Sequence, residues 1–309
     1  MHELFRSTTA YRAIARAAQR GEQAHFTFVL FPDAVYLRSL LTLCAQAFFG
    51  AEEGRTAKLI AEENYADCIF CPARGAKLTA EGAAELLGES ALSPVEGDKK
   101  LFVLDAFHQV TPLVQNKLLK VLEEPPEGVY FLAGATAEHT VLPTILSRAE
   151  KIAVPPFSAE ALSAALRRLH PGAREIAAAA AASGGLLSAA EELLSGGGAA
   201  FRLAVRFLTE EDGAALSREA GAEKSFLPAL RLVLRDVALY AAGQGKYAAL
   251  RDEDVRRIAG SMPAGAALSA LGLAARAERD VQFNTNPAQA AFMLYLRVNE
   301  EKRKWQKLS

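Results

Sequence analysis

Five short apolar runs, separated by helical patterns, constrain the fold of the first half of this chain. They are HFTFVLF (25–31), DCIFC (67–71), KLFVLD (100–105), VYFLAGA (129–135) and KIAVPP (151–156). The runs show little alternation of apolar and polar residues, which is typical of strands buried on both faces of a parallel sheet. The intervening helical patterns include 34–49, 80–87 and 113–122, with Thr111 and Pro112 starting the last. The first half therefore predicts a doubly wound, five-stranded α/β domain.

The residue pattern of the second half predicts helices only. Segment 158–198 indicates three short helices, with Ser158 as the first N-cap and the glycine run Gly196–Gly198 as a boundary. Segment 199–309 consists of amphipathic helical patterns, and Asn286 caps the last of them. We therefore expect three domains: an α/β domain at 1–157, a small helical domain at 158–198 and a helical domain at 199–309.

The composition excludes several classes of protein. Of 309 residues, 51% are hydrophobic and 23% are charged, which is typical of a soluble globular protein. The formal net charge of −1 gives the whole chain no general attraction for nucleic acid. Three cysteines cannot form a disulfide framework, and we find neither a signal-peptide core nor an apolar run of ~18 residues. We therefore expect a cytoplasmic protein without a membrane span.

The most specific motifs lie between residues 99 and 158. N-x-L-L-K-x-L-E-E-P-P runs from Asn116 to Pro126, after the strand that ends at Asp105 and before TILSR at 144–148. This order closely resembles the bacterial clamp-loader branch of the AAA+ proteins. SGGLLSAAEELL and NTNPAQAAFMLYL resemble, less specifically, the lid and the last helix of the oligomerisation collar in that family. The resemblance implies an AAA+ sheet, a three-helix lid and a helical collar. It also implies a pentamer that uses ATP to open a sliding clamp and place it on primed DNA.

The nucleotide chemistry of that family is missing from this sequence. A phosphate-binding loop needs glycines followed by Lys and Ser or Thr, but Phe31 is followed by PDAVYLRSLL. We expect Pro32 and Asp33 to form a tight link of roughly two residues into the helix. As the helix N-cap, the Asp33 carboxylate would repel phosphate. Asp105 remains from the magnesium site, but Ala106 replaces the second acid. We therefore predict no nucleotide cofactor, no ATP hydrolysis and no intrinsic enzymatic activity.

The Ser-Arg pair in TILSR is retained. A clamp-loader protein that lacks ATP chemistry but keeps this pair resembles the delta-prime branch of the DNA polymerase III family. The resemblance implies that Arg148, with Ser147 as its motif partner, enters a neighbour's ATP site as an arginine finger. Such fingers contribute roughly 10³–10⁵ in rate. The family usually has cysteine next, where this chain has Ala149. On its residues alone, Arg148 is instead typical of a solvated cation near a strand.

The resemblance also implies partners. These are subunits of delta and gamma/tau type in a hetero-pentamer, and the sliding clamp and primer–template DNA through that complex. The family's four-cysteine zinc module is absent, and the CIFC pair, Cys68 and Cys71, has no second pair beside it. We therefore expect buried structural cysteines and no metal. An alternative is a stand-alone AAA+ ATPase with a degenerate phosphate loop in repair or recombination. A weaker one is a helical scaffold that binds DNA directly. A nucleotide titration separates the first alternative from the leading hypothesis.

Overall fold

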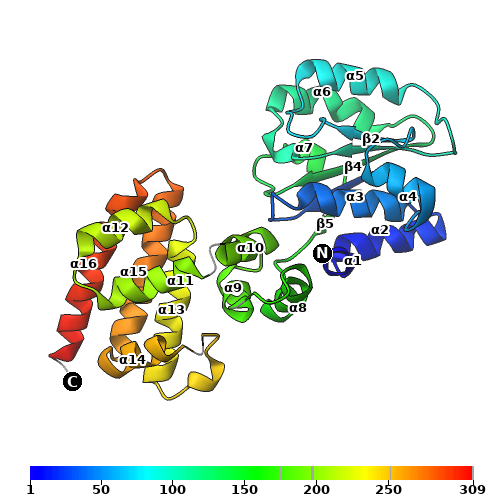
Figure 1. Cartoon of the computed structure of the whole chain (residues 1–309). Coiled ribbons are helices and arrows are strands. Elements are labelled where there is room, and N and C mark those ends of the chain that lie inside the picture. The colour runs from blue at the N-terminus through cyan, green and yellow to red at the C-terminus, as the bar shows by residue number, and fades with distance from the viewer. Residues whose placement is uncertain (174, 196–197, 251, 308–309) are drawn as a thin grey trace. The chain divides into compact units, whose positions relative to one another are not determined.

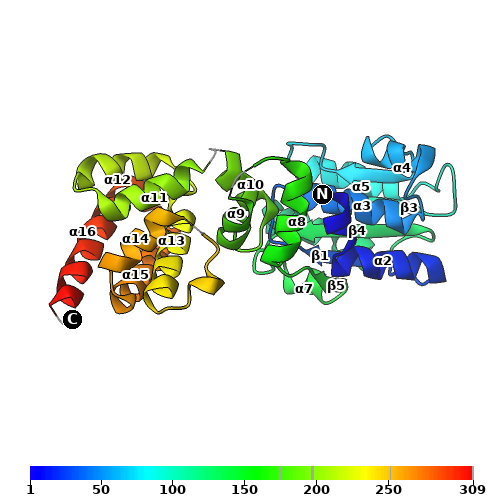
Figure 2. The ribbon, with the colours of Figure 1, turned by 60° about the horizontal axis from the view of Figure 1, so that its bottom comes forward.

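The computed structural model describes residues 1–173, 175–195, 198–250 and 252–307 (Figures 1 and 2). Residue contacts divide the chain into two compact units, Met1–Pro156 and Phe157–Ser309. The second unit contains both of the predicted helical domains. Their division stays a prediction, because Gly196 and Gly197 of the predicted boundary lie outside the described residues.

A five-stranded parallel sheet forms the centre of the first unit. Its strands are β1 (Phe26–Leu30), β2 (Cys68–Cys71), β3 (Lys100–Leu104), β4 (Val129–Ala135) and β5 (Glu150–Ala153). They lie in the order β2-β3-β4-β1-β5, and every neighbouring pair is parallel. Each predicted apolar run supplies one strand, so the predicted doubly wound sheet is confirmed.

Helices cover both faces of this sheet. They are α1 (His2–Arg6), α2 (Thr9–Arg20), α3 (Leu37–Phe48), α4 (Gly54–Ala61), α5 (Ala80–Ser90), η1 (Phe107–Gln109), α6 (Pro112–Glu123) and α7 (Pro143–Leu146). α5, α6 and α7 lie over one face, and α2, α3 and α4 over the other (Figure 1). Gly134 of β4 lets α3 approach closely, because a Cβ there would lie 2.8 Å from a methyl carbon of Leu41. Thr111 and Pro112 begin α6, as predicted.

The predicted start of the first long helix is wrong. α3 begins at Leu37 with Tyr36 as its N-cap, so Asp33 is not the helix cap. The Asp33 carbonyl instead accepts a hydrogen bond from the Tyr36 N–H, 3.2 Å away, in a turn before the helix. The ring of Phe5 packs against both Phe31 and Tyr36, at centroid distances of 6.0 and 5.7 Å. This packing favours the turn, so the link into the helix is longer than Pro32 and Asp33.

The second unit is helical throughout its described residues, as predicted. Its elements are α8 (Ala159–Leu169), α9 (Ile176–Ala182), α10 (Leu187–Ser195), α11 (Ala199–Thr209), α12 (Gly213–Ala222), α13 (Phe226–Ala241), η2 (Gly245–Tyr247), α14 (Glu253–Ser261), α15 (Ala264–Gln282) and α16 (Pro287–Gln306). The predicted caps are confirmed, because Ser158 accepts from the Ala161 N–H and Asn286 from those of Ala288 and Gln289.

The core of this second unit surrounds α13, which packs against α11, α14 and α15 (Figure 2). Over the described part of the chain, no single helix is long and apolar enough to cross a membrane. Taken together, α14 and α15 are long and apolar enough for a membrane span, but the two helices are bent by 111° at the break between them. Along α15, the buried positions are alanines that face this core.

Candidate functional site

The carboxyl ends of β1 and β4 are where a doubly wound sheet normally holds its ligand. β1 connects toward the β2 edge, whereas β4 connects to β5 on the other side of β1, so the chain reverses direction between these neighbouring strands. Ligands in such folds bind in the crevice outside the strand ends at this reversal. The side chains that follow the strands at this edge therefore decide what the site can hold.

Arg38, in the first turn of α3, is the centre of a salt-bridge cluster at this edge. Its Nε and Nη2 atoms donate to the two carboxylate oxygens of Glu63 at 2.8 and 2.7 Å, and Nη1 donates to Asp105 at 3.1 Å. Nη1 and Nη2 also donate to the Pro72 carbonyl at 3.1 and 3.2 Å. The guanidinium lies over the Phe70 ring, 5.3 Å from its centroid. One cation thus neutralises two carboxylates from different segments.

This cluster is largely shielded from solvent. The side chains of Arg38, Glu63 and Asp105 are 14%, 16% and 15% exposed. Hydrogen bonding from Arg38 lowers the pKa of Glu63, and Arg74 adds a further contact at 2.7 Å. Burial opposes the charge on Arg38, but hydrogen bonds to Glu63 and Asp105 outweigh it and raise the pKa of the guanidinium. Both shifts favour the charged forms of Arg38 and Glu63.

The remaining strand ends at this edge are occupied by internal contacts. Phe31 is buried and its N–H donates to the Ala135 carbonyl at 2.9 Å, which extends the pairing of β1 with β4. Asp33, one of the two residues predicted to replace the phosphate loop, is 1% exposed. The Thr136 N–H donates to His108 Nδ1 at 3.4 Å, and burial lowers the pKa of that histidine. These contacts favour a neutral imidazole.

Asp105 has both carboxylate oxygens engaged within the chain. Oδ1 accepts from the N–H of Ala106 at 2.7 Å, and Oδ2 accepts from Arg38. The contact with Arg38 was missed by sequence reasoning, because α3 and β3 are far apart in the chain.

Ser147 and Arg148 follow α7 and share one acceptor. Arg148 Nη1 donates to the Thr144 carbonyl at 2.6 Å, and Ser147 Oγ donates to the same carbonyl at 3.1 Å. Arg148 Nη2 donates to Glu123 at 3.0 Å, so TILSR contacts the LEEPP segment. Hydrogen bonding within this pair raises the pKa of Arg148 and lowers that of Glu123. The Arg148 side chain remains 32% exposed.

Gln115 positions this second site, and sequence reasoning missed it. Its side chain is fully buried; Nε2 donates to the carbonyls of Val110 and Thr140 at 2.8 and 3.0 Å. Its Oε1 accepts from the Leu142 N–H at 2.8 Å. One amide thus ties α6 to the loop that leads into α7. The available signal was a polar residue in helical phase with the apolar Leu118.

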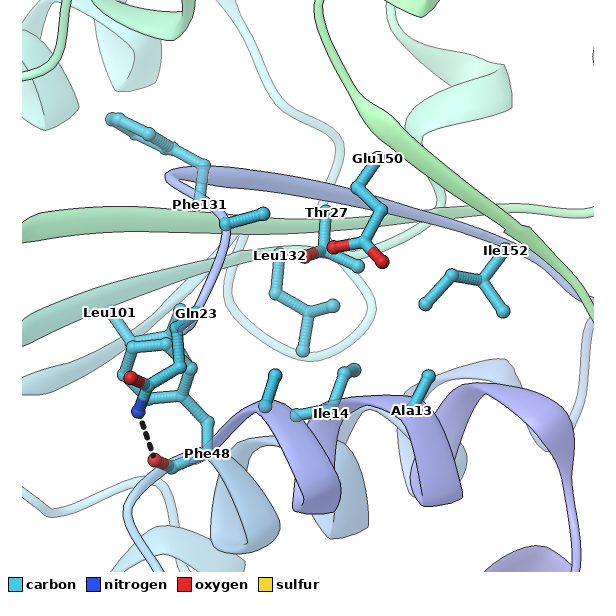
Figure 3. Close-up of a pocket in the computed structure, with 12 residues that line it drawn as sticks. Ala13, Ile14, Gln23, Thr27, Phe48, Leu101, Phe131, Leu132, Glu150 and Ile152 are labelled. Atoms are coloured by element: carbon cyan, nitrogen blue, oxygen red, sulfur yellow. Dashed lines mark hydrogen bonds between the residues drawn. The ribbon is translucent and has the colours of Figure 1, made fainter. Parts of the chain in front are cut away.

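Elsewhere in the first unit, the described residues form no metal site. Cys44, Cys68 and Cys71 are free, and burial raises the pKa of each thiol, that of Cys44 to about 12. Among the residues that the structure describes, no group of three or more His, Cys, Asp or Glu side chains could hold a metal ion. Figure 3 shows a cavity of about 20 Å³ between α2 and the sheet, lined mainly by apolar side chains such as Ile14 and Ile152. Such a volume suits a single water molecule.

Comparisons with known proteins match the first unit to DNA polymerase III. The family described as "DNA polymerase III, delta subunit" matches residues 7–158. The DNA polymerase III subunit gamma/tau of Mycobacterium bovis is 42% identical over 64 residues, which are 21% of this chain and 11% of that protein. The chain thus aligns with only a small part of this relative. The DNA polymerase III subunit delta' of Bacillus subtilis is 28% identical over 127 residues, 39% of each protein.

Among solved structures, a DNA polymerase III gamma subunit-related protein from Thermotoga maritima covers 94% of this chain and 99% of its own, with 16% identity and a TM-score of 0.47. Residues 7–158 thus match the DNA polymerase III delta-subunit family, and they form a doubly wound parallel α/β fold that is followed by helices.

Proposed function

We propose that this chain is a delta-prime-like clamp-loader subunit that hydrolyses no ATP itself and supplies Arg148 to a neighbour's ATP site. The observation that carries the first part is the pairing of Arg38 with Asp105. Magnesium requires carboxylate oxygens at about 2.0–2.1 Å in a near-octahedral arrangement. Both Asp105 oxygens already accept hydrogen bonds, and a guanidinium lies where a cation would have to approach. The residues present do not fit a magnesium–nucleotide complex.

Arg38 is also a poor ligand for phosphate. A guanidinium has five N–H donors. Arg38 makes five hydrogen bonds within the chain, to Glu63, Asp105 and the Pro72 carbonyl. The segment from Phe31 to Leu37 offers neither glycine nor lysine, and its only acidic side chain, Asp33, is buried. A bound triphosphate would therefore have to displace a closed salt-bridge cluster.

Arg148 differs from Arg38 in the ways that a trans-acting finger requires. Its side chain is 32% exposed, against 14% for Arg38. Its hydrogen bonds go to Thr144, Glu123 and, at 3.5 Å, to Ser147, so the guanidinium is oriented without being enclosed. A planar, permanently charged donor suits the charge that develops on a transferring phosphoryl group.

The assembly follows from the same proposal. Subunits of delta and gamma/tau type would be the neighbours in a cytoplasmic hetero-pentamer. The sliding clamp and primer–template DNA would be reached through the complex. Residues 1–157 would carry Arg148, residues 158–198 would form the lid, and residues 199–309 would form the oligomerisation collar. The match of residues 7–158 to the delta-subunit family supports this arrangement.

Calorimetric titration of the isolated chain with magnesium and ATP, and separately with ADP, tests the absence of a nucleotide site. We expect no binding tighter than a Kd of about 1 mM. Micromolar affinity would contradict the proposal and favour the stand-alone ATPase. The variant Arg38→Met serves as a comparison, because it opens the cluster without adding a phosphate loop. We expect it to gain no nucleotide affinity.

A further inference from the structure

We propose that Glu123 is a latch for Arg148: it holds the guanidinium against its own chain and competes with the phosphate of the neighbour's nucleotide. This inference rests on the proposed function, since it assigns a second residue to the same site. Glu123 would act through Arg148 and would not touch the nucleotide itself, so it is a positioning residue.

The geometry of the latch is fixed at both ends. Glu123 is the last residue of α6, and its carboxylate lies 3.0 Å from Arg148 Nη2. Arg148 Nη1 is held at 2.6 Å by the Thr144 carbonyl of α7. Gln115 sets the spacing of the two helices, because its buried amide bonds α6 to the loop before α7. The contact between Glu123 and Arg148 thus joins two firmly placed elements.

The position of Glu123 at the end of a helix favours pairing of its carboxylate with Arg148, and so lets it compete with a nucleotide phosphate for that arginine. A negative charge at the carboxyl end of a helix is unfavourable, because the last carbonyls carry partial negative charge. Pro125 and Pro126 prevent α6 from continuing, so Glu123 stays in the last turn, beside these carbonyls. Arg148 is the cation that compensates the charge, and it lowers the pKa of Glu123 through their hydrogen bond. The ion pair therefore favours the closed position of the arginine in the free chain.

The same pair can open on assembly. The side chains of Glu123 and Arg148 are 51% and 32% exposed. Exposed ion pairs are weak, so a phosphate, which carries more charge and makes strong charge-assisted bonds, can replace the carboxylate. While Glu123 stays beside Arg148, its negative charge opposes the approach of the phosphate. Removing that charge should ease engagement of the finger.

The first test measures ATPase of the assembled loader as a function of ATP concentration. We expect Glu123→Gln to lower the ATP concentration for half-maximal rate by about two- to fivefold, the range for an exposed ion pair. Glu138→Gln is the matched control, because it breaks another exposed pair of the same unit, Glu138 with Lys151 at 2.8 Å. The control should leave the curve unchanged. An unchanged or higher half-maximal concentration in Glu123→Gln would overturn the latch.

A second test needs no partner subunit. Phenylglyoxal attacks the deprotonated guanidine of arginine, and its reaction at each arginine can be followed by peptide mass spectrometry. Because Glu123 raises the pKa of Arg148, Glu123→Gln should make Arg148 react several times faster in the isolated chain. Arg206, paired with Glu210 and Glu219, serves as an internal standard. Equal rates at Arg148 in both proteins would contradict the latch.

These tests separate the latch from the proposed function. If Arg148→Ala leaves the assembled ATPase unchanged, the trans finger is wrong, whatever phenylglyoxal shows. If Arg148→Ala lowers the rate but Glu123→Gln shifts neither measurement, only the latch is wrong. The double variant should behave like Arg148→Ala alone, because Glu123 acts through that arginine.

Discussion

Replacing Arg38 by methionine should strongly destabilise the first unit. The change removes five hydrogen bonds and leaves the carboxylates of Glu63 and Asp105 without their shared cation. Breaking a fully buried ion pair costs about 3–5 kcal/mol. The side chains here are 14–16% exposed, and Arg74 still contacts Glu63, so we expect a lower loss of about 2–4 kcal/mol in the free energy of unfolding.

Urea denaturation of the wild type and of Arg38→Met measures this loss directly. The equivalent shift in thermal midpoint is about 5–15 °C for a unit of this size. Arg74→Met is the matched control, because Arg74 also contacts Glu63 but its side chain is 66% exposed. The control should lose less than about 1 kcal/mol. A loss below about 0.5 kcal/mol in Arg38→Met, which is ordinary for surface positions, would refute the reasoning.

The pH dependence of the free energy of unfolding tests the same ion pair. The folded pKa of Glu63 lies below its unfolded value, so its contribution is fully present above an unfolded pKa of about 4.3 and is lost as the pH falls through the folded pKa. The difference in stability between wild type and Arg38→Met should therefore shrink on acidification below about pH 4. A difference that stays constant there would show that the lost stability comes from packing alone.

Three further predictions concern the first unit. Gln115→Leu should cost about 1–3 kcal/mol, because it leaves the buried Val110 carbonyl and two part-buried backbone groups of the loop before α7 without their partner. Chemical denaturation checks this, and a neutral result would contradict the assigned role. Proton NMR should give His108 a pKa below about 6.5. Its contribution to stability is then present above that pH and falls below it, and a raised pKa would contradict the burial argument. Gly134→Ala should cost about 1–3 kcal/mol by overpacking against α3, and unchanged thermal stability would show that Leu41 yields freely.

The sheet was largely predictable because its central strands β1, β3 and β4 are buried on both faces, whereas the edge strands β2 and β5 are partly exposed. Burial on both faces removes the alternation of polar residues, so each strand is visible as an apolar run without reference to the rest of the chain. The start of α3 was not predictable in this way. Asp33 is a residue type that favours a helix N-cap, but it lies in a turn before the helix. Phe5 packs against Phe31 and Tyr36 on either side of this turn. Tertiary packing thus outweighed a local preference.

The candidate site was predictable only where its residues are neighbours in sequence. Ser147 and Arg148 lie together because they are adjacent, and their motif could be read directly. The Arg38 cluster joins α3, the segment after α4 and the end of β3, which meet only through the order of the sheet. Glu123 was visible within LEEPP, but nothing in the sequence indicated that its carboxylate faces Arg148.

The measurement that tests the central claim most directly is the ATPase rate of a loader reconstituted with Arg148→Ala. Lys151→Ala, an exposed cation of the same unit, is the matched control, and Arg148→Lys tests the need for a planar donor. If Arg148 is a trans finger, the variant assembles normally, but the rate at the neighbouring ATP site falls by about 10³–10⁵. Full ATPase activity in a normally assembled loader containing Arg148→Ala would contradict the account.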